Sequence, residues 1–222
     1  MKVHYIYHSG FLVELEECIL IFDYYTGRLP EFDRGKPVYV FASHRHHDHY
    51  DPLIYRLRQE LTQVTYILSE DIRVSRHEEK QKDVIFIGPR ERRQIGPLKV
   101  ETLLSTDEGV AFAVECGGKN IYHAGDLNWW HWNGEPDEYN EAMEENYKRE
   151  IDHLGGRHFD VAFVPVDPRL EDKFWLGIDY FMRNTDTDKV YPMHCWDSPV
   201  IMDKLLSEPC TEPYRDSIVP VV

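Results

Sequence analysis

Short apolar or alternating runs dominate the first half of the chain and predict β-strands. Three of them form a predicted N-terminal meander: Lys2–Tyr7, Phe11–Glu14 and Cys18–Phe22. Val38–Ala42 is apolar throughout, as in a strand that is buried on both faces. Further strands are predicted at Val64–Leu68, Val84–Ile87, Leu98–Leu104, Val110–Glu115 and Asn120–Tyr122.

Helical signals begin at Asp51-Pro52, which resembles an N-cap followed by proline at the first helical position. Apolar residues then follow at helical spacing: Leu53, Ile54, Leu57 and Leu61. The second half mixes three predicted helices, Glu138–Leu154, Phe174–Met182 and Val200–Leu206, with two predicted strands, Val161–Val166 and Lys189–Met193. Many strands with interspersed helices indicate a layered α/β sandwich. Without repeats or a dividing linker, the chain is expected to form one domain, residues 1–222.

The composition excludes several classes of protein. A chain of 222 residues with 42% hydrophobic positions can bury a core, which argues against disorder. Its 25 basic and 40 acidic residues give a net charge of −15, which disfavours nucleic acid and anionic membranes as partners. No signal peptide or membrane span is recognisable, and the four cysteines have no CxxC spacing. We therefore expect a cytoplasmic protein with free thiols; the oligomeric state is not predicted.

The candidate chemistry is concentrated in Ser43–Tyr50, which follows the buried strand Val38–Ala42 and contains four histidines and an aspartate within six residues. Imidazole and carboxylate groups bind Zn²⁺, Fe and Mn²⁺. His44 and His46 are expected to share one ion, and Asp48 and His49 to reach a second. The alternative is a solvated, histidine-rich loop.

The chain resembles the metallo-β-lactamase-fold hydrolases, whose signature is His-x-His-x-Asp-His after a core strand. The resemblance extends over the whole chain through three further segments: Tyr7–Phe11, Leu20–Asp23 and Ile121–Asp126. Tyr191-Pro192-Met193-His194 matches the strand that delivers the family's last histidine. The Pro-Met-His and His-Ala-Gly-Asp sequences look most like the branch that includes L-ascorbate-6-phosphate lactonase. The resemblance implies a four-layer αββα sandwich, with Asp126 bridging two metals and His194 as a ligand.

The strand pattern supports these ligands independently, because His44, Asp126 and His194 each follow a predicted strand. A turn role for Asp126 and a packing role for His194 are the alternatives. The family's usual histidine between the first motif and Asp126 is missing, since the strand Leu98–Leu104 leads into Ser105-Thr106-Asp107. Asp107 is the predicted replacement; Thr106 holding a water, or a weak first metal position, are alternatives.

Tryptophans surround these ligands in the sequence. Trp129, Trp130, Trp132 and Trp196 are predicted, with His123, to line a substrate pocket, while packing is the alternative for each of them. Packing is the preferred interpretation of His8. The acidic stretch Glu135–Asp152 is interpreted as a solvated helix face that can cover the cleft. Cys195 is interpreted as a small buried residue, not a nucleophile.

The expected function is a metal-dependent hydrolase with one or two Zn²⁺ ions, Mn²⁺ or Fe being alternatives. A metal-bound hydroxide would attack a small ester, lactone or phosphoester, with Asp48 and Asp126 as the catalytic residues. Two other functions remain open: a phosphodiesterase or nuclease of the same fold, and a non-catalytic metal-binding or sensing protein.

Overall fold

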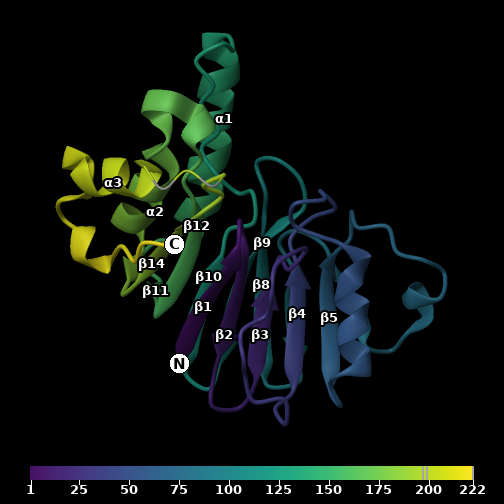
Figure 1. Ribbon diagram of the computed structural model, residues 1–222. Helices are drawn as coiled ribbons and strands as arrows, with labels where there is room; N and C mark the ends of the chain where they lie inside the picture. Colours follow the sequence, from purple (N-terminus) through teal and green to yellow (C-terminus); the bar gives the residue numbers. More distant parts are fainter. Residues whose placement is uncertain (197, 199, 222) are drawn as a thin grey trace.

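The fold is built on two β-sheets packed face to face (Figure 1). The computed structural model describes residues 1–196, 198 and 200–221. Within them, the six strands of sheet A follow one another in chain order: β1 (Lys2–Tyr7), β2 (Gly10–Glu14), β3 (Ile19–Phe22), β4 (Val38–Ala42), β5 (Val64–Ser69) and β6 (Val84–Ile87).

Sheet B is assembled from the rest of the chain, with strands from its end at one edge. Its order in the described residues is β14 (Val190–Met193), β12 (Val161–Pro165), β10 (Lys119–His123), β9 (Val110–Cys116), β8 (Leu98–Leu104) and β7 (Arg92–Ile95). A small parallel pair, β11 (His158–Phe159) and β13 (Asp186–Thr187), lies beside it.

Helices cover the outer faces of both sheets. On the side of sheet B lie α1 (Asp137–Asp152), α2 (Leu176–Asn184) and α3 (Val200–Ser207) (Figure 1). Sheet A is covered by a 3₁₀ helix, η1 (Pro52–Gln59). The shorter 3₁₀ helices are η2 (Glu78–Lys80), η3 (Pro168–Lys173), η4 (Pro209–Thr211) and η5 (Arg215–Ser217). The order of layers, helix–sheet–sheet–helix, confirms the predicted αββα sandwich.

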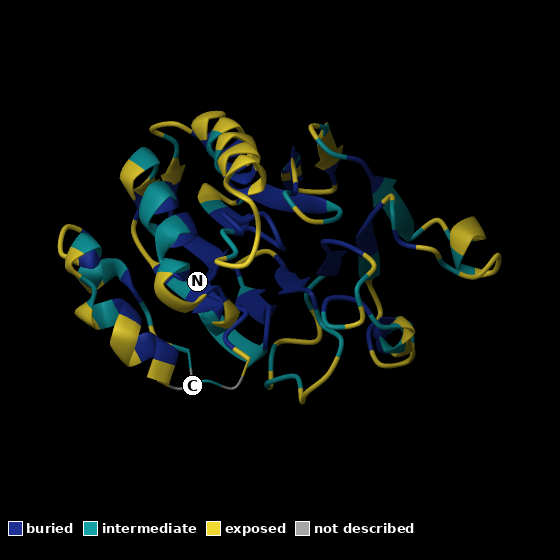
Figure 2. Ribbon diagram, turned by 90° about the horizontal axis from the view of Figure 1, so that it is seen from above, coloured by how far each residue is buried: buried dark blue, intermediate teal, exposed yellow. Residues whose placement is uncertain are grey.

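The burial of the strands explains why their sequences are continuously apolar. In β3, Leu20 and Phe22 belong to the core between the sheets, whereas Ile19 and Ile21 pack with Ile54 of η1. Since successive strand residues point to opposite faces, a strand covered on both sides needs apolar residues throughout. Buried residues accordingly fill the two sheets and the inner sides of the helices, while exposed residues lie on outer helix faces and loops (Figure 2).

The direction of the strands positions the site. In sheet A, β1 and β3 run antiparallel to β2, and β4 runs parallel to β3. In sheet B, β8 and β10 run antiparallel to β9, and β12 and β14 run parallel to β10. Of the strands that therefore end at one edge, seven are followed there by a polar residue or motif that concerns the site: His8, Asp23, His44–His49, Asp107, Asp126, Asp167 and His194.

Several elements differ from the sequence prediction. The two-residue strands β11 and β13 and the short 3₁₀ helices η2–η5 were not predicted. β7 was not predicted, because its sequence Arg-Arg-Gln-Ile is polar, with the three residues before Ile95 exposed at the sheet edge. The helix after Asp51 begins as expected, with the Asp51 side chain accepting a hydrogen bond from the Leu53 N–H at 2.7 Å, but it is a 3₁₀ helix. The other predicted elements are confirmed to within two residues at each end.

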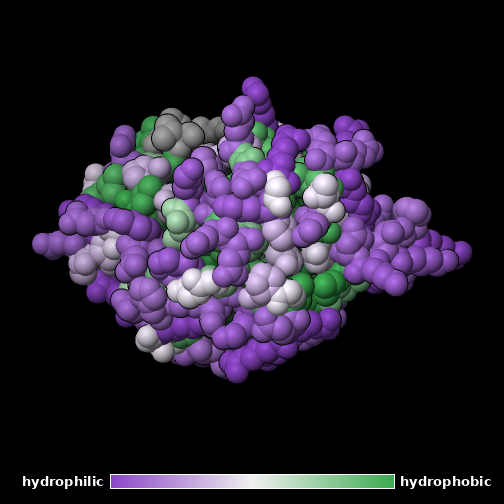
Figure 3. Space-filling model, turned by 90° about the horizontal axis from the view of Figure 1, so that it is seen from below, coloured by the Kyte–Doolittle hydropathy of each residue, from purple (hydrophilic) through white to green (hydrophobic). Residues whose placement is uncertain are grey.

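The surface seen from below is mainly hydrophilic, with small separate hydrophobic patches (Figure 3). In the described part of the chain, no helix is long and apolar enough to cross a membrane.

Candidate metal centre

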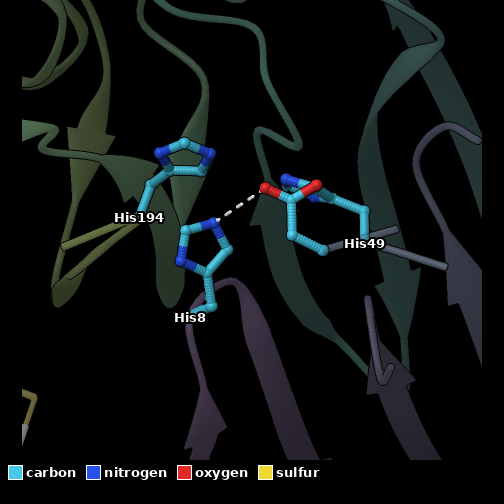
Figure 4. Close-up of side chains that lie close together, drawn as sticks. His8, His49 and His194 are labelled. Carbon is cyan, nitrogen blue, oxygen red and sulfur yellow. Dashed lines mark ion pairs between the residues drawn. The ribbon is translucent and has the colours of Figure 1, made fainter. Parts of the chain in front are cut away.

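Four side chains from three strand ends form a first group of potential metal ligands, which we call the His8 cluster: His8, Asp48, His49 and His194. One ligand atom from each residue lies within 4.8 Å of the corresponding atoms of the other three. His8 follows β1, and its Nε2 lies 3.5 Å from an Asp48 carboxylate oxygen. The rings of His8, His49 and His194 face the same space (Figure 4).

A second group, the His44 cluster, consists of His44, His46, Asp107 and Asp126, whose ligand atoms also lie within 4.8 Å of one another. The His44 Nε2 and His46 Nδ1 atoms are 3.0 Å apart. An Asp107 oxygen lies 3.7 Å from the same His46 nitrogen. The structure thus places Asp107 beside the two histidines, where the sequence lacks the usual third histidine.

Asp126 joins the two clusters. Its Oδ2 is 3.4 Å from His44 Nε2, and its Oδ1 is 3.2 Å from His49 Nε2 and 3.5 Å from His194 Nε2. The side chain is nearly inaccessible to solvent. Asp126 is therefore the carboxylate able to contact ions in both clusters.

Two further buried carboxylates orient the histidine rings. Asp23 accepts a hydrogen bond from His49 Nδ1 at 2.7 Å and another from the Ser43 hydroxyl at 2.7 Å. Asp167 accepts one from His194 Nδ1 at 2.8 Å. A carboxylate on Nδ1 fixes the tautomer and leaves Nε2 unprotonated to face a metal. The sequence analysis did not assign these roles to Asp23 and Asp167.

Unpaired buried atoms fit the binding of metal ions. His8 Nε2, His49 Nε2 and Asp126 Oδ1 are buried, and none of them has a hydrogen bond of acceptable geometry within the described residues. Burying such atoms without a partner is costly, so native proteins pair nearly all of them. Nitrogen and carboxylate donors gathered around one space suit a borderline divalent ion such as Zn²⁺. The donor set therefore fits the metals expected from the sequence.

Backbone strain is concentrated around the same residues. His8, Asp23, His194 and Trp196 have φ values of 55°, 43°, 63° and 48°, in the left-handed region that residues other than glycine rarely adopt. Such strain persists where the surrounding structure holds it, and it gathers at functional sites. His8 is the main ligand candidate that the sequence analysis interpreted as packing. Its position directly after a strand is the signal that could have indicated it.

Two glycines explain how the segments carrying Asp107 and Asp126 come so close to Ser43 and His44 at the end of β4. The Val110 N–H donates a hydrogen bond to the Ser43 carbonyl at 2.9 Å. A Cβ atom on Gly109 would lie 2.0 Å from that carbonyl oxygen, and one on Gly125 would lie 2.6 Å from the Ser43 Cβ. Only glycine fits at both positions, which also have positive φ values.

Neutral imidazole and ionised carboxylate are the forms that bind metal. The electrostatics favour these forms at His44 and Asp126, whereas the carboxylates of Asp126 and Asp23 outweigh burial at His49 and raise its pKa well above the usual value. Burial, reinforced by the nearby His49, lowers the pKa of His44 to about 4. Burial opposes ionisation of Asp126, but the charges of His49 and His194 outweigh it and hold its pKa well below the usual value. Burial and the neighbouring Asp126 raise the pKa of Asp107.

A cavity of about 420 Å³ opens over both clusters. Its lining includes Trp130, Trp132 and Trp196, three of the tryptophans proposed from the sequence for a substrate pocket, together with Tyr139 and Met143 of α1. The acidic helix therefore contributes a wall of the pocket. Other lining residues are His46, His47, Asp48, Thr106, Asp107, Asp126, Arg169 and His194.

Two predicted pocket residues do not line this cavity. Trp129 packs instead against Tyr147 and Tyr180. His123 is fully buried, with its ring stacked on Phe22 and its Nε2 2.8 Å from the Ser9 carbonyl oxygen. Placing them in the pocket was wrong, because both side chains point into the packed interior.

Cys195 does not line the cavity either. Burial, together with the charge of Asp167, raises the pKa of this thiol to about 12, so it is not a thiolate at neutral pH. If the reaction uses the expected metal-bound hydroxide, the Cys195→Ser variant should retain turnover within about twofold, because that reaction needs no covalent thioester. Loss of activity with unchanged metal content would contradict this expectation.

Comparison with known proteins places the chain among proteins of related fold. A family model described as "Beta-lactamase superfamily domain" matches residues 2–134. A UPF0173 metal-dependent hydrolase from Alkaliphilus metalliredigens is 30% identical over 145 residues. That match covers 57% of this chain and 63%, just under two thirds, of the relative.

Solved structures share the fold at low sequence identity. Igni18, a metallo hydrolase from Ignicoccus hospitalis, aligns with a TM-score of 0.61 and 17% identity, over 99% of this chain and 94% of its own. CmlA, a diiron β-hydroxylase from Streptomyces venezuelae, aligns with a TM-score of 0.57 and 13% identity, over 86% of this chain and 44% of its own. These likenesses concern the fold alone.

Proposed function

The chain belongs to the β-lactamase superfamily, and we propose that it is a metal-dependent hydrolase of small esters or lactones. The observation that carries this proposal is the pair of four-residue clusters, joined by Asp126, at the floor of an aromatic-walled cavity. The curated relative that is named a metal-dependent hydrolase supports the same activity.

We propose two metal positions. His8, Asp48, His49 and His194 would hold one ion, and the His44 cluster would hold the other, with Asp126 shared. Divalent metals at such a site polarise the substrate's carbonyl oxygen and make hydroxide available at neutral pH. Zn²⁺ is the proposed ion. Mn²⁺ and Fe are the alternatives, because the His44 cluster contains two carboxylates and because CmlA holds iron on the same fold.

The remaining residues would position the ligands and move a proton. Asp23 and Asp167 hold the rings of His49 and His194 through their Nδ1 atoms. Asp48 lines the cavity beside His8, so its carboxylate is positioned to take a proton during turnover. Trp130 and Trp132, whose rings stack with centroids 6.0 Å apart, would exclude water from one side of the substrate.

A small molecule suits the pocket, because about 420 Å³ falls within the roughly 300–1,000 Å³ of typical ligand sites. A lactone like that of the ascorbate-6-phosphate lactonase branch remains the finer prediction for the substrate. A cytoplasmic setting and a single domain likewise remain proposals.

A hydrolase screen tests the proposed function. Protein prepared without chelator would be analysed for bound metal and then assayed on lactones, carboxylic esters, thioesters and phosphodiesters. We expect hydrolysis of esters or lactones by the metal-loaded protein and none by the stripped protein. Preference for phosphodiesters would identify a phosphodiesterase. No turnover of any substrate by fully loaded protein would indicate a metal-binding or sensing protein.

Asp107 provides a test of the second metal position. We expect the Asp107→Ala variant to bind one ion fewer than the wild type, or to bind it at least about tenfold more weakly, because the His44 cluster would lose the one carboxylate that it contains besides Asp126. Calorimetric titration of the stripped protein with Zn²⁺ measures the stoichiometry and affinity.

Glu108 offers the matched control, since it lies next in the chain but outside the His44 cluster. Its carboxylate pairs with Arg45 and with His46 Nε2. Glu108→Ala should bind the same number of ions as the wild type. Equal stoichiometry and affinity in Asp107→Ala would show that Asp107 is not a ligand.

A further inference from the structure

Arg169 introduces a positive charge into a cavity whose other permanently charged side chains are carboxylates. It lies on η3, directly after Asp167 and Pro168, and its side chain is 50% exposed. It is the one arginine or lysine among the residues that line the cavity. The lining carboxylates are those of Asp48, Asp107 and Asp126.

The guanidinium of Arg169 is held in place by Asp167. Its Nε lies 2.9 and 3.0 Å from the two carboxylate oxygens, and its Nη2 donates to one of them. The Arg169 backbone N–H also donates to the Asp167 side chain, at 2.8 Å. An arginine side chain has five N–H donors. In Arg169 the Nη1 group has no hydrogen-bond partner among the described residues. A fixed arginine with a spare donor group suits the binding of an oxyanion.

Flat aromatic surfaces flank the charge. The guanidinium carbon lies 4.7 Å from the centre of the Trp196 ring and 5.7 Å from that of Trp132. Trp196 is 43% exposed, although large aromatic side chains usually lie buried. An exposed tryptophan beside a positively charged group can contact the apolar body of a ligand whose anionic end binds the arginine.

Asp167 links this arginine to the metal-ligand candidates. The same carboxylate oxygen accepts hydrogen bonds from His194 Nδ1 at 2.8 Å, from Trp196 Nε1 at 3.0 Å and from Arg169. A single carboxylate therefore separates the guanidinium from His194. A group bound to Arg169 would consequently lie close to the bond that is cleaved.

We propose that Arg169 selects the substrate: a small ester or lactone with a flat apolar body and an anionic group, carboxylate or phosphate, near the scissile bond. The proposal rests on the proposed function, because it names the substrate class of the same pocket. Among the protein side chains that line the cavity, Arg169 alone offers a permanent positive charge to such a group.

Binding of non-reactive probes tests this independently of turnover. Benzoate, phenyl phosphate and the neutral benzyl alcohol would be titrated into metal-loaded wild type, Arg169→Gln and Arg34→Gln, with bound metal measured in each. Arg34 is the matched control, because it also pairs with a carboxylate, Glu60 at 2.8 Å, and lies over an aromatic ring, Phe32, but outside the cavity.

We expect one or both anions to bind about 10–100-fold more weakly to Arg169→Gln than to the wild type, as for loss of charged hydrogen bonds. Benzyl alcohol should bind both proteins alike, and Arg34→Gln should match the wild type. The anion that loses more affinity identifies carboxylate or phosphate as the recognised group. Arg169→Lys, which keeps the charge, should restore part of the affinity.

Three outcomes would overturn the proposal: no anion binding to the wild type, unchanged anion binding in Arg169→Gln, or equal weakening of the anions and benzyl alcohol. The last would show that Arg169 only positions Asp167 and His194. A kinetic comparison separates this proposal from the proposed function. If the protein hydrolyses the neutral ester phenyl acetate but does not prefer the anionic ester 4-acetoxybenzoate to it, only the selectivity proposal fails. If it hydrolyses neither of these nor any other ester or lactone, the hydrolase proposal itself fails.

Discussion

The Asp126→Ala variant is expected to lose hydrolytic activity almost completely. The Asp126 carboxylate lies within 3.5 Å of histidine Nε2 atoms in both clusters, those of His44, His49 and His194. Its removal would leave two positive ions without their shared carboxylate. We expect a fall in kcat/KM larger than the roughly 10–100-fold that accompanies loss of a residue hydrogen-bonded to a metal ligand. Steady-state kinetics at matched metal content measures it.

Asp160→Ala is the control for that experiment. Asp160 is similarly inaccessible, at 9% exposure against 5% for Asp126, but it pairs with Lys119 outside the cavity. The Asp160→Ala variant should be less stable than the wild type and should keep its activity. Activity of Asp126→Ala within tenfold of the wild type would show that the two clusters do not act through this carboxylate.

Removal of metal is expected to destabilise the fold strongly. The proposed ligands follow strands of both sheets, so bound ions tie the sheets together and stabilise only the folded state. An ion at a free concentration about 1,000 times its Kd adds roughly 4 kcal/mol to the free energy of unfolding. For a chain of this size, each 1 kcal/mol shifts Tm by about 2–4 °C. Chelation should therefore lower Tm by about 8–16 °C for each ion that is bound this tightly, as scanning calorimetry would measure.

Added Zn²⁺ or Mn²⁺ should restore both Tm and activity. The Asp126→Ala protein, with its clusters weakened, should show a smaller shift on chelation. An unchanged Tm in thoroughly demetallated wild type would contradict the prediction that ions bound in these clusters stabilise the folded state.

Much of the fold could be predicted, because most strands have an apolar sequence that identifies the strand without information about its neighbours. Val38–Ala42 and Val84–Ile87 have the predicted bounds, since burial on both faces removes the need for alternation. The strand Arg92–Ile95 was not predicted, because pairing with β8 at the sheet edge stabilises it without an apolar sequence. The residue pattern within one segment does not reveal such pairing with another strand.

The candidate site was predictable only in part, for a similar reason. The motif His44–His49 is dense enough to be recognised alone, and Asp107 could be inferred from the missing histidine. His8 was interpreted as packing, because its position directly after a strand is only a weak signal and its role depends on β1 lying beside strands that come much later in the chain. Asp167-Pro168-Arg169 looks like an ordinary helix start, and it does act as one, with Asp167 as the N-cap of η3. Only the structure shows that the same carboxylate also binds His194.

The central claim is that the two clusters hold two metal ions side by side, with Asp126 between them. Anomalous X-ray diffraction from crystals of the metal-loaded protein tests it most directly. We predict two peaks roughly 3.5–4 Å apart, one among His8, Asp48, His49 and His194, the other among His44, His46, Asp107 and Asp126. Peaks confined to the group His158, Asp160 and Asp188 outside the cavity, or no peak within the cavity, would contradict the claim.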